Sequence, residues 1–103
     1  MKVITPGHTY EVPGFENEAN VQTIQSIHKE PIKEGSKTLR TVKDGTTNED
    51  LLEILLDRMQ FLQVKFPCRE NAIAIIKLNE ALLWLNKRTL DRTKRRVEGT
   101  NAS

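Results

Sequence analysis

The second half of the chain carries a helical repeat of apolar residues that is interrupted once, by a proline. Apolar side chains recur at steps of three and four residues through 51–62 and again through 72–85. Pro67 separates the two runs, and the residue before a proline, here Phe66, is disfavoured in helical backbone angles. The pattern predicts a hairpin of two helices, the first of about 18 residues and the second of about 27, over residues 69–95.

The ends of these predicted helices carry their own signals. Thr46-Thr47-Asn48-Glu49-Asp50 offers a capping box, in which a threonine hydroxyl accepts from the third backbone N–H and a carboxylate reaches back. Beyond the second helix, Gly99 is expected to act as its stop.

The first 46 residues lack this repeat and are rich in short β-favouring runs. The runs cover 8–12, 21–28 and 38–42, and turn pairs such as Pro13-Gly14 and Asp44-Gly45 separate them. This half predicts two or three short strands in a small antiparallel meander. The whole chain is therefore expected to be α+β, with a strand-rich region over 1–46 and a helical hairpin over 47–103, together one structural unit.

The predicted helices hold more apolar residues than one hairpin can bury. Residues 75–76 and 82–85 are all apolar and cover more than one face of the second helix. Each large apolar side chain left in water forgoes about 1.5–3 kcal/mol of burial. The strands can cover part of this surface, and we expect oligomerisation through the long helix to cover the rest.

Overall composition narrows the class of protein. The 103 residues hold 16 basic and 14 acidic side chains, and a net charge of +2 argues against bulk binding of nucleic acid. No apolar run approaches the roughly 18 residues of a membrane span, and the start MKVITPGHTY lacks the apolar centre of a signal peptide. A single cysteine cannot form an internal disulfide, so we expect a reducing cytosol.

No pattern typical of an active site is present in the sequence. His8 and His28 lie in the strand-rich half, and no cysteine, serine or aspartate is spaced for a catalytic triad. Metal-ligand spacings and glycine-rich phosphate loops are also absent. Cys68 lies near a helix start, where a thiolate is favoured, but a small residue at a tight corner explains it more simply. We predict no enzymatic activity, no metal site and no cofactor.

Positive charge is concentrated at the end of the second predicted helix. Residues 87–96 hold six lysines and arginines against Asp91 alone. Arg88, Arg92 and Arg96 are spaced i, i+4 and i+8, so they form one stripe, and arginine suits forked contacts with phosphate. The pattern indicates an anion site, especially if copies of the helix meet around an axis. A solvated helix end, where cations suit the helix dipole, is the alternative.

The corner between the helices is a second candidate. Phe61, Phe66, Arg69 and Asn71 fall within eleven residues, and an aromatic face, an arginine and an amide suit a nucleobase with its phosphate. The alternative is that both phenylalanines are core residues of the turn and Asn71 is a capping side chain.

These features resemble the helical-hairpin module of a family of phage immune-evasion sponges, typified by anti-CBASS protein two and Thoeris anti-defence protein one. The resemblance covers residues 44–101 and is carried by the following segments: Pro67-Cys68-Arg69-Glu70-Asn71, Leu83-Trp84-Leu85, Arg88-Thr89-x-x-Arg92 and Arg96-Val97-Glu98-Gly99-Thr100. The strand-rich first half is similar to the Thoeris branch, since shorter anti-CBASS members lack such an extension.

The resemblance implies a hexamer that binds cyclic nucleotide signals in the cytoplasm of an infected bacterial host and cleaves nothing. It implies two kinds of pocket. One takes cyclic trinucleotides near a threefold axis, with residues Arg88, Thr89, Arg92 and Arg96. The other takes glycocyclic ADP-ribose or cyclic dinucleotides between protomers, with residues Phe61, Asn71 and Arg69 and a basic side chain from the strands, Arg40 or Lys37.

Two other interpretations of the residues stay open. The basic helix end could belong to a small oligomeric module that is either nucleic-acid-binding or regulatory, with an affinity for DNA or RNA that falls steeply with salt. Alternatively, the chain could be a purely structural oligomerisation module, whose arginines are solvated charges that bind no ligand.

Overall fold

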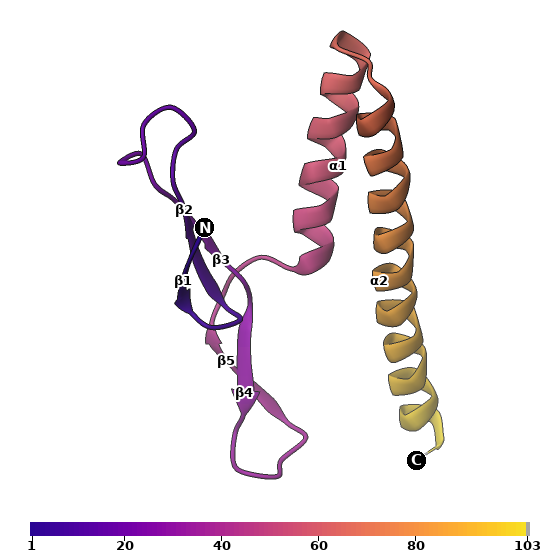
Figure 1. The fold of residues 1–103 in the computed structure, drawn as a ribbon. Helices are drawn as coiled ribbons and strands as arrows, with labels where there is room; N and C mark the ends of the chain where they lie inside the picture. The colour runs from indigo at the N-terminus through magenta and orange to yellow at the C-terminus, as the bar shows by residue number, and fades with distance from the viewer. Residues whose placement is uncertain (103) are drawn as a thin grey trace. The chain divides into compact units, whose positions relative to one another are not determined.

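The computed structural model describes the backbone of residues 1–102 and the side chains of residues 1–95. Its elements follow the order of five strands and then two helices (Figure 1). The chain separates into two compact units, Met1–Thr47 and the part that begins at Asn48. Among the described residues, no helix combines the length and the apolar character that crossing a bilayer requires.

Three strands form the first sheet of the N-terminal unit. β1 (Lys2–Thr5), β2 (Thr9–Val12) and β3 (Gln22–Gln25) pair antiparallel in sequential order. The turn between the first two strands closes with the His8 N–H donating to the Thr5 carbonyl at 2.9 Å. Gly7 in this turn has a φ of +78°, a backbone conformation that side chains with a Cβ rarely adopt.

A second, two-stranded sheet corrects the prediction of a single meander. β4 (His28–Pro31) and β5 (Leu39–Lys43) pair antiparallel and apart from the first three strands. The run predicted over 21–28 breaks into two strands because the chain changes partners there: the Ser26 N–H donates to the His8 carbonyl at 2.7 Å, and the Ile27 N–H donates to the Thr46 carbonyl at 2.9 Å. β1 was not among the predicted runs.

Two further contacts hold these sheets together. The imidazole rings of His8 and His28 stack with centroids 3.6 Å apart and an angle of 7° between their planes. The Thr46 N–H donates to the Gln25 carbonyl at 2.8 Å. Gly45 makes this second contact possible, because a Cβ there would clash with the Gln25 carbonyl oxygen. The histidines therefore have a structural place in this unit.

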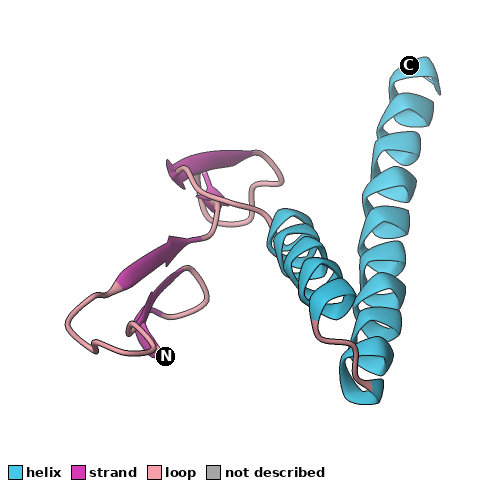
Figure 2. Cartoon of the chain, turned by 90° about the horizontal axis from the view of Figure 1, so that it is seen from above, coloured by secondary structure: helices cyan, strands magenta, loops and turns pink. Residues whose placement is uncertain are grey.

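The second unit is the predicted hairpin of two contacting helices. α1 (Asn48–Lys65) and α2 (Arg69–Ala102) lie side by side and are joined by one short connection (Figures 1 and 2). α1 has the predicted 18 residues, and its start places Asp50 at the third helical position. α2 has 34 residues and continues past Gly99, so the predicted stop there is wrong. One glycine costs a helix about 1 kcal/mol, which does not end it unless another signal follows.

The apolar stripes of the two helices face each other along one seam. Leu56 of α1 is the one buried apolar side chain among the described residues, with 6% of its surface exposed. Other seam residues are half-buried: Leu52, Met59, Ile75, Leu78, Leu82 and Leu85. Most of the remaining large apolar side chains of the hairpin are exposed. One hairpin therefore leaves much of its apolar surface unburied, as the sequence predicts.

Candidate functional site

The seam between α1 and α2 has a polar contact near the start of α1. The Thr89 hydroxyl lies 3.2 Å from the Glu49 carboxylate oxygen and 3.2 Å from the Leu85 carbonyl oxygen, and it can donate to either. Glu49 is half-buried. Because α1 begins at Asn48, the part of α2 beyond Thr89 extends past the end of its partner helix.

The predicted arginine stripe begins beside Thr89, at Arg88, and continues into this extension. Its described arginines are all exposed, as are the two neighbouring lysines: Arg88, Arg92 and Arg95, with Lys87 and Lys94. Arg92 lies one turn beyond Thr89 on a similar side of the helix, whereas Arg88 is rotated away from Thr89 by about 100°. The side chain of Arg96, the fourth predicted residue of the trinucleotide site, lies outside the described residues.

Asp91 lies within this group of cations and is paired to one of them. The Lys87 ammonium donates to the Asp91 carboxylate at 2.9 Å. This hydrogen bond and the charge of Lys87 lower the pKa of the Asp91 carboxyl below its ordinary value, and the charges of Arg95 and Lys94 lower it further. Asp91 thus stands among the positive charges of Lys87, Lys94 and Arg95 at this end of α2.

A shallow hollow of about 260 Å³ lies on one side of the stripe. It is lined by Trp84, Lys87, Arg88, Asp91 and Arg95. The structure thus brings Arg88 together with Arg95 and Trp84, while Thr89 faces α1. Trp84 is missing from the predicted site, because its sequence context is that of an apolar helix residue. The spacing of Trp84 and Arg88, four residues apart on one helix, is the signal that could have found it.

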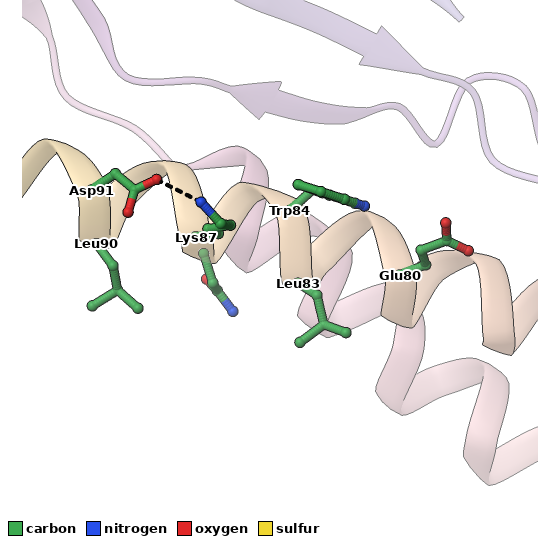
Figure 3. Close-up of a pocket in the computed structure, with 7 residues that line it drawn as sticks. Glu80, Leu83, Trp84, Lys87, Leu90 and Asp91 are labelled. Carbon is green, nitrogen blue, oxygen red and sulfur yellow. Dashed lines mark hydrogen bonds and ion pairs between the residues drawn. The ribbon is translucent and has the colours of Figure 1, made fainter.

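A second hollow, of about 500 Å³, shares Trp84, Lys87 and Asp91 with the first, but the surface that lines it is mostly apolar. Figure 3 shows Leu83 and Leu90 pointing together to one side of α2, with the Trp84 ring on another side and Lys87 bonded to Asp91. Leu83, Trp84 and Leu90 each expose more than 60% of their surface. Trp84 therefore lies at the border between an apolar surface and a cationic one.

The corner between the helices is fixed by two residues. The side-chain amide of Gln63 donates to the Cys68 carbonyl at 2.9 Å and accepts the Cys68 N–H at 3.2 Å. The Cys68 sulfur accepts the Asn71 N–H at 3.4 Å, so Cys68 caps α2. The capping side chain recorded at this start is therefore that of Cys68 and not that of Asn71, and the Cys68 N–H that an Asn71 side chain could cap is already bonded to Gln63.

The exposed surface of the two phenylalanines tests the alternative that they are core residues of the turn. Phe61 and Phe66 expose 58% and 72% of their surface, so neither is a core residue of this hairpin. Phe61 lies about 140° around α1 from buried Leu56, and the Lys65 ammonium stands 4.5 Å from its ring centroid. Lys65 is a cation that the sequence interpretation did not include.

The other residues predicted for this second pocket are distributed over both units. Asn71 is half-buried near the corner and Arg69 is exposed there. Lys37, between β4 and β5, and Arg40, within β5, are exposed side chains of the N-terminal unit. Within the described part of the chain, no group of three or more histidine, cysteine, aspartate or glutamate side chains could hold a metal ion.

The match to known protein families begins at β4 and ends within α2. The family model described as "Acb2/Tad1, hairpin domain" matches residues 28–90, more than half of the chain. A protein of Bacillus phage SBSphiJ7 named "Thoeris anti-defense 1" is 56% identical over 59 residues. That alignment covers 56% of this chain and 42% of the phage protein, so the matched segment spans less than half of that relative. The family match contains Phe61, Asn71 and Arg88 and ends before Arg92.

Proposed function

The chain belongs to the Acb2/Tad1 hairpin-domain family, and we propose that it is a phage anti-defence protein that sequesters cyclic nucleotide signals of bacterial immunity. The identity of 56% to a Thoeris anti-defence protein is the observation that carries this proposal. The protein would act on Thoeris signalling, on CBASS signalling, or on both, in the cytoplasm of the infected host. It would bind these signals without cleaving them.

The cationic end of α2 supports a ligand that carries several phosphates. Arg88, Arg92 and Arg95 project into solvent from the same end of one helix. Guanidinium groups donate paired hydrogen bonds to phosphate oxygens, and such charge-assisted bonds are stronger than neutral ones. We assign cyclic trinucleotides to Arg88, Thr89, Arg92 and Arg96.

The corner supports a second pocket for smaller ligands, glycocyclic ADP-ribose or cyclic dinucleotides. Phe61 offers an exposed aromatic face for a base, and Asn71 and Arg69 offer polar groups nearby along the chain. Arg40 or Lys37 would supply a further cation. Residues from neighbouring copies would complete both kinds of pocket in a homo-oligomer, a hexamer in our proposal.

Recovery of intact ligand tests the central claim. The purified protein is incubated with a panel of cyclic nucleotides, washed, and heated to release what it holds. We expect at least one cyclic nucleotide to return unchanged by mass spectrometry. Recovery of linear or hydrolysed products would identify an enzyme instead. Binding of DNA or RNA that falls steeply with salt, with no cyclic nucleotide retained, would favour a nucleic-acid-binding module.

A double variant tests the separation of the two pockets. We expect Arg88→Ala with Arg92→Ala to weaken binding of cyclic triadenylate by at least about 100-fold, because charge-assisted bonds to phosphate contribute about 1.5–3 kcal/mol each. Binding of glycocyclic ADP-ribose is expected to stay within about twofold, since its pocket uses other residues. Isothermal titration calorimetry measures both, and equal loss of both ligands would contradict the two-pocket arrangement.

A further inference from the structure

Trp84 lies within the family match but is not among the residues predicted for either pocket. It is the single tryptophan of the chain, and 65% of its surface is exposed. Its ring lies along the surface of α2, away from Leu83 and Leu90 (Figure 3). A large aromatic ring in this position either packs on another molecule or leaves a costly apolar surface in water.

The chemistry around the ring indicates what that other molecule is. The 260 Å³ hollow beside Trp84 is lined by Lys87, Arg88 and Arg95, and its one carboxylate, Asp91, is already bonded to Lys87 at 2.9 Å. A flat aromatic face beside guanidinium groups suits a ligand that is itself flat at one end and anionic at the other. A nucleobase joined to a phosphate has this form.

The size of the hollow limits how much ligand it holds. Pockets that enclose a drug-sized molecule have volumes of about 300–1,000 Å³. A hollow of about 260 Å³ is smaller, and it is open along one helix. It therefore fits one base with its phosphate rather than a complete cyclic oligonucleotide.

We propose that Trp84 and Arg95 form a nucleotide subsite with Arg88, in which the indole stacks on one base of a cyclic oligonucleotide and the two guanidinium groups bind the adjacent phosphate. This inference rests on the proposed function and adds to it the residue that recognises the base. Trp84, Arg88 and Arg95 are spaced i, i+4 and i+11, so α2 alone places all three on one side. Each further copy of the helix supplies one more subsite.

The single tryptophan gives a direct test in the unmodified protein. Cyclic triadenylate is titrated into the wild-type protein while the fluorescence of Trp84 is followed, and binding is measured in parallel by calorimetry. Stacking is expected to decrease the fluorescence with the same midpoint as the calorimetric curve. Inorganic phosphate, which has no base, is expected to leave the fluorescence unchanged. Calorimetric binding with no fluorescence change would overturn the subsite and leave sequestration intact.

Variants at Trp84 and Arg95 test the stacking of the base and the phosphate contact separately. Trp84→Phe keeps an aromatic ring and is expected to bind within a few fold of wild type, whereas Trp84→Leu is expected to lose about 5- to 100-fold in affinity. Arg95→Gln is expected to lose about tenfold, and its matched control Lys94→Gln, an exposed neighbour outside the hollow, less than about twofold.

The results distinguish two kinds of failure. If Arg95→Gln and Lys94→Gln lower the ligand affinity equally, the arginine acts only through general charge attraction and the subsite is overturned. If calorimetry shows that the protein binds none of the cyclic nucleotides, both the subsite and the proposed function are overturned.

Discussion

Asp91 limits how strongly the cationic end of α2 attracts an anion. Its carboxylate pairs with Lys87 and lines the same hollow as Arg88 and Arg95. We expect Asp91→Asn to raise the affinity for a phosphate-bearing ligand by about two- to fivefold, because it removes the one negative charge from this lining. Calorimetry at two salt concentrations measures the gain, which should shrink as salt rises.

Glu80 provides the control for this prediction. Glu80→Gln removes the same charge from an exposed position about 16 Å from Asp91 along α2, one turn before Trp84 and outside the cationic hollow, so it should raise the affinity less than Asp91→Asn does. The pH dependence follows from the lowered pKa of Asp91: its ion pair with Lys87 persists above that pKa and is lost as pH falls through it. Asp91 therefore stays ionised between pH 5 and 7, and its protonation should not alter ligand affinity in that range. If the affinity of the wild-type protein does change with pH there, and Asp91→Asn abolishes that change, the lowered pKa of Asp91 is contradicted.

Individual site residues could be predicted from the sequence where one helix carries them. Arg88 and Arg92 stand four residues apart, so their position on one stripe follows from helix geometry alone. The partner of Thr89 could not be predicted, because Glu49 lies 40 residues away and meets it only when the hairpin closes. Trp84 is a different case, because periodicity marks it as an apolar helix residue but does not tell whether its face of the helix is covered.

At the scale of elements, the corner of the hairpin depends on Gln63. Its side-chain amide makes two hydrogen bonds to the backbone of Cys68, which caps α2. We expect Gln63→Ala to lower the free energy of unfolding by about 1–2 kcal/mol, because it leaves the Cys68 N–H and carbonyl to water. Urea denaturation followed by circular dichroism measures this loss.

Variants at Cys68 serve as the comparison. Cys68→Ser retains a capping atom and is expected to be neutral or stabilising, whereas Cys68→Ala is expected to cost about 0.5–1 kcal/mol. A larger loss for serine than for alanine would show that the sulfur has a role other than capping α2.

The two halves differ in how far the sequence predicts their elements. The helices follow from local repeats, a capping signal before Asn48 and a proline at position 67, all within a few residues of the structure they specify. The strands depend on partners. Residues 22–25 and 28–31 read as one run, but their backbones pair with different strands, β2 and β5. Such pairing is nonlocal, so the run alone could not predict two sheets.

At the scale of the whole molecule, surface chemistry divides α2 into three faces. The seam face contacts α1 through half-buried leucines, the face with Leu83 and Leu90 is apolar and exposed, and the face with Arg88 and Arg95 is cationic. The alternative of a solvated helix end accounts for the cationic face but not for the exposed apolar face. The combination suits an assembly whose copies meet through one face and hold ligand on the next.

A charge placed on the apolar face tests this assembly. We expect Leu83→Asp with Leu90→Asp to convert an oligomer to a smaller species in light scattering, because burying two carboxylates in an interface costs several kcal/mol. Ile54→Asp is the control, since Ile54 on α1 is exposed to 65%, compared with 70% and 69% for the two leucines. Ligand binding should fall with assembly in the double variant and persist in the control. A double variant that stays assembled would place the contact between copies elsewhere, and loss of assembly in both would extend that contact to α1.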